Sequence, residues 1–288
     1  MVCSTISLYR KPMIPNLPTF KILPIERLIL HEDHDLQRTL PLVEKLRAQG
    51  ILRNPPIVMP LPDNSGRFMV LDGANRVTSL REMEFPHIVA QVVESNNPNV
   101  NLQTWNHVVW GMDTEVLMDS LEKVKGIQLI KIDTKKSLDA PKYTPLQIRL
   151  PDGSFYILDE APSDLATHID TLHQIVNSYK TGASLDRTSQ TLIDSVKKVF
   201  PDLTVLVIFP SFKIKTVLKL AGQNIVLPTG ITRFTVSPRA LHLNYPLHEL
   251  SSGKPIEYKE AYLQRWVDER VKNKGVRHYA EQTFLFDE

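Results

Sequence analysis

"RFMVLDGANRVTSLREM", residues 67–83, is the stretch that decides the fold of the first third of the chain. Residues 67–72 are rich in the apolar types that favour a β-strand. The residues after the turn carry apolar side chains at helical spacing, Val77, Leu80 and Met83. A strand that feeds directly into a helix predicts an α/β unit, and the residues at the junction indicate what that unit can bind.

The junction is Asp72-Gly73-Ala74-Asn75, followed at once by Arg76. Free backbone N–H groups at a helix N-terminus favour an anion, a glycine permits close approach of a phosphate, and an arginine can form paired hydrogen bonds with its oxygens. Asp72 does not suit phosphate, but it suits Mg²⁺ or a substrate hydroxyl. The alternative is an ordinary turn that Gly73 makes and that Asp72 or Asn75 caps. These residues alone leave both interpretations open.

The segments around this stretch extend the α/β unit. Strands are predicted at 20–30, 55–61, 67–72 and 87–94, and helices at 40–50 and 75–84. The segment "SNNPNVN" (95–101) is rich in Asn and Pro and is typical of a linker. We therefore predict one mixed α/β domain at residues 1–97 and a second, larger one at residues 98–288.

The second part of the chain also mixes helices and strands. Its clearest signal is "LQIRLPDGSFYILDE" (146–160), a hairpin with two alternating runs around Pro-Asp-Gly. The other predicted elements are helices at 114–124, 164–178, 188–199, 212–223 and 258–273, strands at 126–133, 203–209 and 278–286, and extended pairs at 232–247.

Composition and charge exclude several classes of protein. The 34 Lys and Arg residues nearly balance the 32 Asp and Glu residues in a chain of 288, so the formal net charge of +2 makes a nucleic-acid partner a poor expectation. Cys3 is the sole cysteine, which excludes an intramolecular disulfide and a cysteine-based metal site. The most apolar run, "LTVLVIF" (203–209), is too short to span a bilayer, and residues 1–18 lack the apolar core of a signal peptide. A cytoplasmic protein without a membrane partner is the expectation.

Three further segments carry residues suited to chemistry. In "LILHEDHDLQR" (28–38) His and carboxylates form a candidate metal site or general base, although acids are also common before helices. In "LQTWNHVVWG" (102–111) an extended backbone would place Trp105 and His107 on one side, as ligand contacts or as core and cap. In "LPTGITRFTV" (227–236) a turn presents Thr232 and Arg233, which suit a carboxylate or phosphate but also occur in surface turns.

These segments, in this order, resemble a known family. "GILRNPPIV" followed by "FMVLDGANRVTSL" resembles the ParB/sulfiredoxin-like fold. Together with "HE", "TWNH", "LPTGITRFTVSPRALHLNYPL" and "YAEQTFLF", they resemble the free L-serine kinases of that fold over nearly the whole chain. The family includes archaeal ADP-dependent enzymes and a staphylococcal type from staphyloferrin B biosynthesis, and the chain is more similar to the staphylococcal type. The resemblance implies a ParB/sulfiredoxin-like N-terminal domain, a larger mixed α/β C-terminal domain and a ligand cleft between them.

The resemblance also implies a role for each matching residue. Glu32 would take the proton from the serine hydroxyl, and Asp72 would lie beside the reacting groups, where it can also hold the metal. The residues matching nucleotide- or phosphate-binding segments are Arg53, Gly73, Ala74, Asn75 and Arg76. Those matching the segments that grip the amino acid are Trp105, His107, Thr232 and Arg233. The implied cofactor is Mg²⁺, and the implied donor is ATP, with ADP as the alternative.

One residue departs from the family pattern, and two other functions remain to be weighed. Asn75 stands where family members often have His, and asparagine can form hydrogen bonds but cannot carry charge near neutral pH. A ParB-like DNA- or nucleotide-binding regulator without turnover is the main alternative. A sulfiredoxin-like reductase is excluded, because Ala74 and Asn75 occupy the turn in which that chemistry needs a cysteine.

Overall fold

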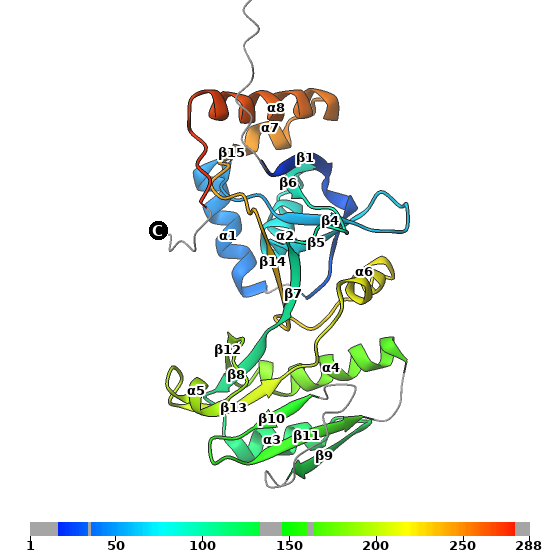
Figure 1. Cartoon of the computed structure of the whole chain (residues 1–288), viewed down its shortest axis with the longest axis vertical. Helices are drawn as coiled ribbons and strands as arrows, with labels where there is room; N and C mark the ends of the chain where they lie inside the picture. The colour runs from blue at the N-terminus through cyan, green and yellow to red at the C-terminus, as the bar shows by residue number, and fades with distance from the viewer. Residues whose placement is uncertain (1–16, 34–35, 133–145, 161–163, 280–288) are drawn as a thin grey trace, which may run out of the picture.

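The computed structural model describes residues 17–33, 36–132, 146–160 and 164–279. Two sheets, one above the other in Figure 1, form the framework of a mixed α/β fold. The predicted strand at 278–286 falls almost entirely on residues 280–288, and Cys3 falls on residues 1–16, so both lie outside the described residues. Within the described ranges, no helix is long and apolar enough to cross a membrane.

The first sheet has five strands in the order β1-β6-β4-β5-β2. Their bounds are Thr19–Pro24, His87–Val92, Ile57–Pro60, Phe68–Asp72 and Leu28–Leu30. Pairing is parallel between β2 and β5 and between β4 and β6, and antiparallel elsewhere. Helices α1 (Leu36–Gln49) and α2 (Ala74–Glu82) accompany this sheet, and Val77 and Leu80 of α2 are fully buried in its core. The strand-turn-helix prediction for residues 67–83 is confirmed.

The second sheet has six strands, all antiparallel, in the order β12-β8-β13-β10-β11-β9. Their bounds are Ser184–Thr188, Asn106–Trp110, Leu203–Ile208, Gln147–Arg149, Phe155–Glu160 and Ile127–Ile132. Helices α3 (Thr114–Glu122) and α4 (Leu165–Lys180) bury their apolar faces against it. The predicted hairpin at 146–160 is confirmed as β10 and β11.

The helix predicted at 188–199 is wrong in its first half. Residues 184–188 form β12, which pairs with β8 along its whole length, and a short helix α5 covers only Ile193–Lys197. Strand β12 overlaps the predicted helix only at residue 188, and it forms through pairing with β8, a contact between segments far apart in sequence. Strand β8 is paired on both sides, with β12 and with β13, so the segment that begins at Asn106 is not an edge strand.

A two-stranded ribbon runs between the two sheets in Figure 1. It consists of β7 (Val100–Thr104) and β14 (Thr232–Val236), with Thr232 opposite Thr104. Helix α6 (Ile214–Gly222) lies beside β2, and one hydrophobic cluster includes Met69 and Leu71 of the first sheet together with Val109 of the second. The two sheets therefore share apolar contacts across the region in which the ribbon lies.

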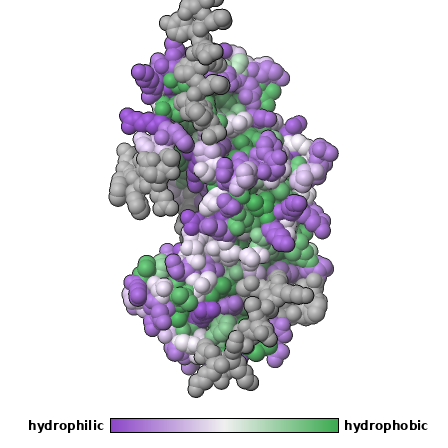
Figure 2. All heavy atoms as spheres, viewed as in Figure 1, coloured by the Kyte–Doolittle hydropathy of each residue, from purple (hydrophilic) through white to green (hydrophobic). Residues whose placement is uncertain are grey.

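The C-terminal part of the chain returns to the first sheet (Figure 1). Strand β15 (Tyr245–Pro246) pairs with β3 (Ile51–Leu52), and helices α7 (Leu247–Ser251) and α8 (Ile256–Lys272) follow. Leu263 and Val267 of α8 are buried in the same cluster as Ile22 of β1. A division of the chain at residue 97 therefore does not coincide with the division into hydrophobic cores, and the domain limits 1–97 and 98–288 stay a prediction. Figure 2 shows hydrophilic and hydrophobic residues interspersed on the visible face.

Candidate active site

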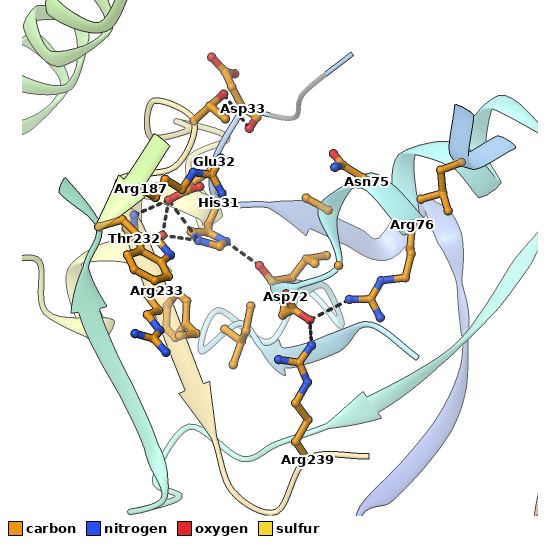
Figure 3. A pocket seen from close by; sticks show the side chains of 18 residues that line it. His31, Glu32, Asp33, Asp72, Asn75, Arg76, Arg187, Thr232, Arg233 and Arg239 are labelled. Atoms are coloured by element: carbon orange, nitrogen blue, oxygen red, sulfur yellow. Dashed lines mark hydrogen bonds and ion pairs between the residues drawn. The ribbon is translucent and has the colours of Figure 1, made fainter. Parts of the chain in front are cut away.

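A pocket of about 550 Å³ lies where the end of β2, the β5–α2 turn and the start of β14 meet. Figure 3 shows Glu32 and Thr232 on one side of it and Asp72, Arg76 and Arg239 on the other. The residues that line it are His31, Glu32, Asp33, Leu42, Val70, Leu71, Asp72, Gly73, Ala74, Asn75, Arg76, Trp105, Arg187, Thr229, Thr232, Arg233, Phe234 and Arg239. Charged side chains of both signs thus face one space.

Glu32 is fixed in this pocket by backbone N–H groups of Gly230 and Thr232, which lie far along the chain from it. It follows β2 and forms a parallel bridge with Leu227, where the Leu227 N–H donates to the His31 carbonyl at 2.8 Å. The Gly230 N–H donates to Glu32 Oε2 at 2.8 Å and the Thr232 N–H to Oε1 at 2.6 Å. The Thr232 hydroxyl donates to Oε1 as well, and the Glu32 side chain is 14% exposed. A carboxylate held by three donors has one orientation, as a general base requires.

His107 supports the turn that holds Glu32 through a hydrogen bond to the Gly230 carbonyl. The His107 side chain is fully buried, its Nε2 lies 3.1 Å from the Gly230 carbonyl, and its Nδ1 lies 2.8 Å from the Tyr179 hydroxyl. A carbonyl only accepts, so Nε2 carries the hydrogen and Nδ1 accepts from Tyr179. Burial lowers the pKa of His107 to about 3, with a smaller contribution from the positive charge of Arg187, so the ring is neutral at pH 7.

The opposite wall is the Asp72–Arg76 turn. Gly73 has φ +97° and is the N-cap of α2, and a Cβ on it would lie 2.9 Å from the Pro56 Cβ. Asp72 Oδ2 accepts from Arg76 at 2.7 Å and from Arg239 at 2.6 Å. The turn therefore needs glycine at position 73. It presents to the pocket the N-terminus of α2 and the Asp72 carboxylate, which accepts hydrogen bonds from both guanidinium groups.

Arg76 and Arg239 differ in how firmly they are held. The Arg76 guanidinium also donates to the carbonyls of Asn54 at 2.7 Å and Pro55 at 3.1 Å, and burial lowers its pKa while the Asp72 charge opposes that effect. The Arg239 side chain is 45% exposed. Arg76 therefore fastens the turn to residues 54–55, while Arg239 presents its charge toward the pocket.

The third group of side chains comes from the ribbon and from β12. The Arg233 guanidinium lies 4.5 Å from the centre of the Trp105 ring, a cation–π contact that orients it. Arg187 lies on β12 opposite His107, and its guanidinium occupies the space beside Gly230. These two arginines add positive charge near Glu32, which suits a substrate that carries a carboxylate or phosphate.

Comparisons with known proteins find similarity to one group of enzymes. No family model matches the chain. The "ATP-dependent L-serine kinase SbnI" of Staphylococcus aureus is 25% identical over 272 residues, which cover 93% of this chain and 97% of that protein. The chain is therefore similar over nearly its whole length to a free serine kinase. An "ATP-dependent L-serine kinase" of Staphylothermus marinus is a further relative, 27% identical over 128 residues, or 42% of this chain and 49% of that protein.

Solved structures of the free serine kinase family share the fold. The structure of SbnI with a C-terminal truncation, from Staphylococcus aureus, has a TM-score of 0.68 at 22% identity and covers 89% of this chain and 97% of that chain. A free serine kinase in complex with AMP has a TM-score of 0.67 at 15% identity and covers 82% of this chain and 96% of that chain. The chain therefore shares its mixed α/β fold with these structures.

Nine of the eleven residues singled out in the sequence line the pocket: Glu32, Asp72, Gly73, Ala74, Asn75, Arg76, Trp105, Thr232 and Arg233. Arg53 and His107 do not line it. The Arg53 carbonyl accepts from the Asn244 N–H at 3.1 Å, and His107 supports the Gly230 turn. The assigned roles stay predictions, and the geometry indicates an indirect role for His107.

Three pocket residues, Arg187, Arg239 and His31, were not among the predicted site residues, although Glu32 next to His31 was. Arg239 lies in "SPRALHL", inside a segment quoted for the family resemblance, so that segment held a usable signal. Arg187 lies in "SLDRT", almost all of which precedes the helix predicted at 188–199, and nothing local marks it as a pocket residue.

The carboxylates of the pocket fit a magnesium ion that arrives with a nucleotide. Among the residues that the structure describes, no group of three or more His, Cys, Asp or Glu side chains is placed to hold a metal. Mg²⁺ bound with phosphates commonly uses only one or two protein carboxylates. Asp72 and Asp33 both line the pocket and offer such ligands, whereas the Glu32 oxygens already accept from three donors.

Proposed function

We propose that this protein phosphorylates free L-serine, transferring a phosphoryl group from a nucleotide to the side-chain hydroxyl to give O-phospho-L-serine. The observation that carries the proposal is the position of Glu32. Its carboxylate is fixed on one wall of a pocket whose opposite wall is the glycine turn and helix N-terminus at residues 72–76. A base facing an anion-binding turn across one space is the arrangement that phosphoryl transfer to a hydroxyl needs.

In the proposed reaction Glu32 accepts the proton of the serine hydroxyl as that oxygen attacks the phosphorus. The N–H groups at the start of α2 and the Arg239 guanidinium bind the phosphate oxygens, and Asp72 orients Arg239 through its 2.6 Å ion pair. Arg233, held against Trp105, binds the serine carboxylate. Together these interactions hold the serine hydroxyl in line with the phosphorus that it attacks. Such positioning, with stabilisation of the phosphate charge, accounts for most of the catalysis of phosphoryl transfer.

Mg²⁺ would be held by Asp72, with Asp33 as the second available carboxylate, together with the nucleotide phosphates. When bound, the ion supplies neutralisation of phosphate charge. Asn75 lines the pocket one residue before Arg76, where it can donate its amide hydrogens to a phosphate without adding charge.

ATP is the proposed donor, and ADP is the second candidate. The similarity along 93% of the chain to a relative named for ATP supports this choice. The domain roles follow from the same proposal: the ParB/sulfiredoxin-like part, residues 1–97, binds the nucleotide, and residues 98–288 bind serine. The product would supply a route to a siderophore, 2,3-diaminopropionate or cysteine, each of which can start from an activated serine side chain.

The test supplies purified protein with Mg²⁺, serine and either ATP or ADP, and measures phosphoserine by mass spectrometry. The expected result is phosphoserine with ATP at a rate at least about tenfold above that with ADP, and little product with threonine, whose extra methyl group must fit the same pocket. The absence of phosphoserine with both donors would overturn the proposal. A nucleotide- or DNA-binding regulator with this fold would then be the better explanation, and tight sequence-specific DNA binding at physiological salt would identify it.

A further inference from the structure

Arg187 reaches the pocket from β12 and lies against the turn that holds Glu32. It pairs with His107 of β8, and its guanidinium packs on the Cα of Gly230, where a Cβ would lie 2.3 Å from Nε of Arg187. The N–H of the same Gly230 donates to Glu32 Oε2 at 2.8 Å. Figure 3 shows Arg187 near Glu32, on the side of the pocket away from Asp72. The glycine at position 230 thus lets an arginine lie next to the proposed base.

The charge of Arg187 is not offset in the way that the charges of two other pocket arginines are. Asp72 forms ion pairs with Arg76, at 2.7 Å, and with Arg239, at 2.6 Å. Among the described residues, no ion pair joins Arg187 to a carboxylate, and the residue is exposed. A guanidinium that lines a pocket in this state has its N–H groups available for an anionic ligand.

The proposed reaction brings three anionic groups into the pocket, and two of them already have a partner. The nucleotide phosphates have the N-terminus of α2 on the opposite wall, and the serine carboxylate has Arg233. Adjacent residues of a strand point to opposite faces, so the contact of Thr232 with Glu32 directs Arg233 to the other face of β14, where it lies on Trp105. The third anion is the phosphoryl group itself, which moves toward the serine oxygen beside Glu32 and therefore toward Arg187.

We propose that Arg187 binds the oxygens of the phosphoryl group as this group passes from the nucleotide to serine. The inference deepens the proposed kinase function and rests on it. The serine oxygen forms a bond to phosphorus, the bond from phosphorus to the bridging oxygen of the nucleotide breaks, the nucleotide keeps that electron pair, and Glu32 takes the serine proton. Arg187 loses no proton and only donates hydrogen bonds. Because these bonds strengthen as the group leaves the nucleotide, they raise kcat and leave the KM values nearly unchanged.

The first test measures phosphoserine formation by Arg187→Gln. We expect kcat to fall by about 10²–10³-fold, with the KM for serine and for ATP within about threefold of the parent. Arg187→Lys keeps the charge but not the planar set of donors, so its kcat should lie between those of the parent and Arg187→Gln.

Lys180→Gln is the matched control for the loss of a positive charge. Burial lowers the pKa of His107, and the charges of Arg187 and Lys180 both add to this effect, so the two cations act on the same region. Lys180 donates to the Thr229 hydroxyl at 3.5 Å and does not line the pocket. We expect Lys180→Gln to keep the parental kinetics. A parental kcat for Arg187→Gln, or an equal loss in both variants, overturns the proposal.

The second test measures binding and does not depend on turnover. Calorimetry without nucleotide gives the affinities of the parent and of Arg187→Gln for L-serine and for O-phospho-L-serine, and urea denaturation verifies that the variant is folded. We expect Arg187→Gln to lose at least about tenfold in affinity for phosphoserine and none for serine. The carboxylate is common to both ligands, so an equal loss for both would assign Arg187 to the carboxylate and overturn the proposal. Unchanged affinity for phosphoserine would overturn it as well.

The failure of this proposal and the failure of the kinase function are distinguishable. If the parent forms phosphoserine and Arg187→Gln does so with the parental kcat, the role of Arg187 is overturned and the kinase function stands. If the parent forms no phosphoserine with either nucleotide, the kinase function is overturned, and with it the role of Arg187 in the transfer.

Discussion

The buried ring of His107 predicts a specific acid sensitivity of folding. Burial lowers its pKa from 6.5 to about 3, so the folded protein leaves the ring neutral while the unfolded chain binds a proton below pH 6.5. The free energy of unfolding then falls as the pH decreases from 6.5 toward 3, and it is independent of this ring above that range. This difference in proton binding lowers the free energy of unfolding by roughly 2 kcal/mol between pH 7 and pH 5.

The substitution His107→Gln isolates this contribution. Glutamine can donate to the Gly230 carbonyl and accept from the Tyr179 hydroxyl, as the histidine does, but it does not titrate. Urea denaturation at pH 7, 6 and 5 gives the free energy of unfolding of both proteins. We expect the parent to lose about 2 kcal/mol more than the variant over this range. The exposed His278 provides the control, because His278→Gln should leave the pH dependence unchanged. Equal slopes for the parent and His107→Gln would refute the neutral buried ring.

The remaining predictions concern the pocket. Glu32→Gln replaces one carboxylate oxygen by an NH2 group, which cannot accept from a backbone donor, and the neutral amide cannot take up the serine proton. Phosphoserine formation should therefore fall by about 10²–10⁴-fold while nucleotide affinity, measured by calorimetry, stays near the parental value; parental turnover would exclude Glu32 as the base. Gly230→Ala places a Cβ 2.3 Å from Nε of Arg187 at φ +77°, so we expect about 1–3 kcal/mol of lost stability in urea together with a lower turnover number, and parental values of both would contradict the role of this turn. Arg233→Lys keeps the charge but loses the planar contact with Trp105, and should raise the KM for serine more than the KM for ATP; an equal rise in both would place Arg233 elsewhere.

The parts of the structure that follow from local sequence were predictable. The turn at Gly73 joins a strand to a helix within a few residues, and its φ of +97° is the conformation that only glycine adopts without strain. The hairpin at 146–160 and the buried strand within 203–209 carry equally local signals, and the structure has both. Strand β12 was not predicted, because the polar sequence "SLDRT" becomes a strand through its pairing with β8.

The arrangement of the site depends on contacts that no local pattern encodes. Glu32 was expected to act as a base, but its donors at Gly230 and Thr232 lie about 200 residues away in the chain. Arg239 reaches Asp72 from a loop 167 residues further on, and a lone arginine in an extended segment gives no sign of that ion pair. The extended segment after Trp105 was expected to display His107 to a ligand, but β8 lies inside a sheet, and the ring is buried behind the turn it supports.

The central claim is that Glu32 acts in phosphoryl transfer from ATP to free serine. Phosphorus-31 NMR of a mixture of the protein, Mg²⁺, ATP and L-serine follows that transfer directly. We expect a growing phosphomonoester signal that matches authentic O-phosphoserine, equal loss of the terminal phosphate of ATP, and no such signal within the same time for Glu32→Gln. ATP consumption that yields only inorganic phosphate, or a phosphoserine signal that grows at the same rate with Glu32→Gln, would contradict it.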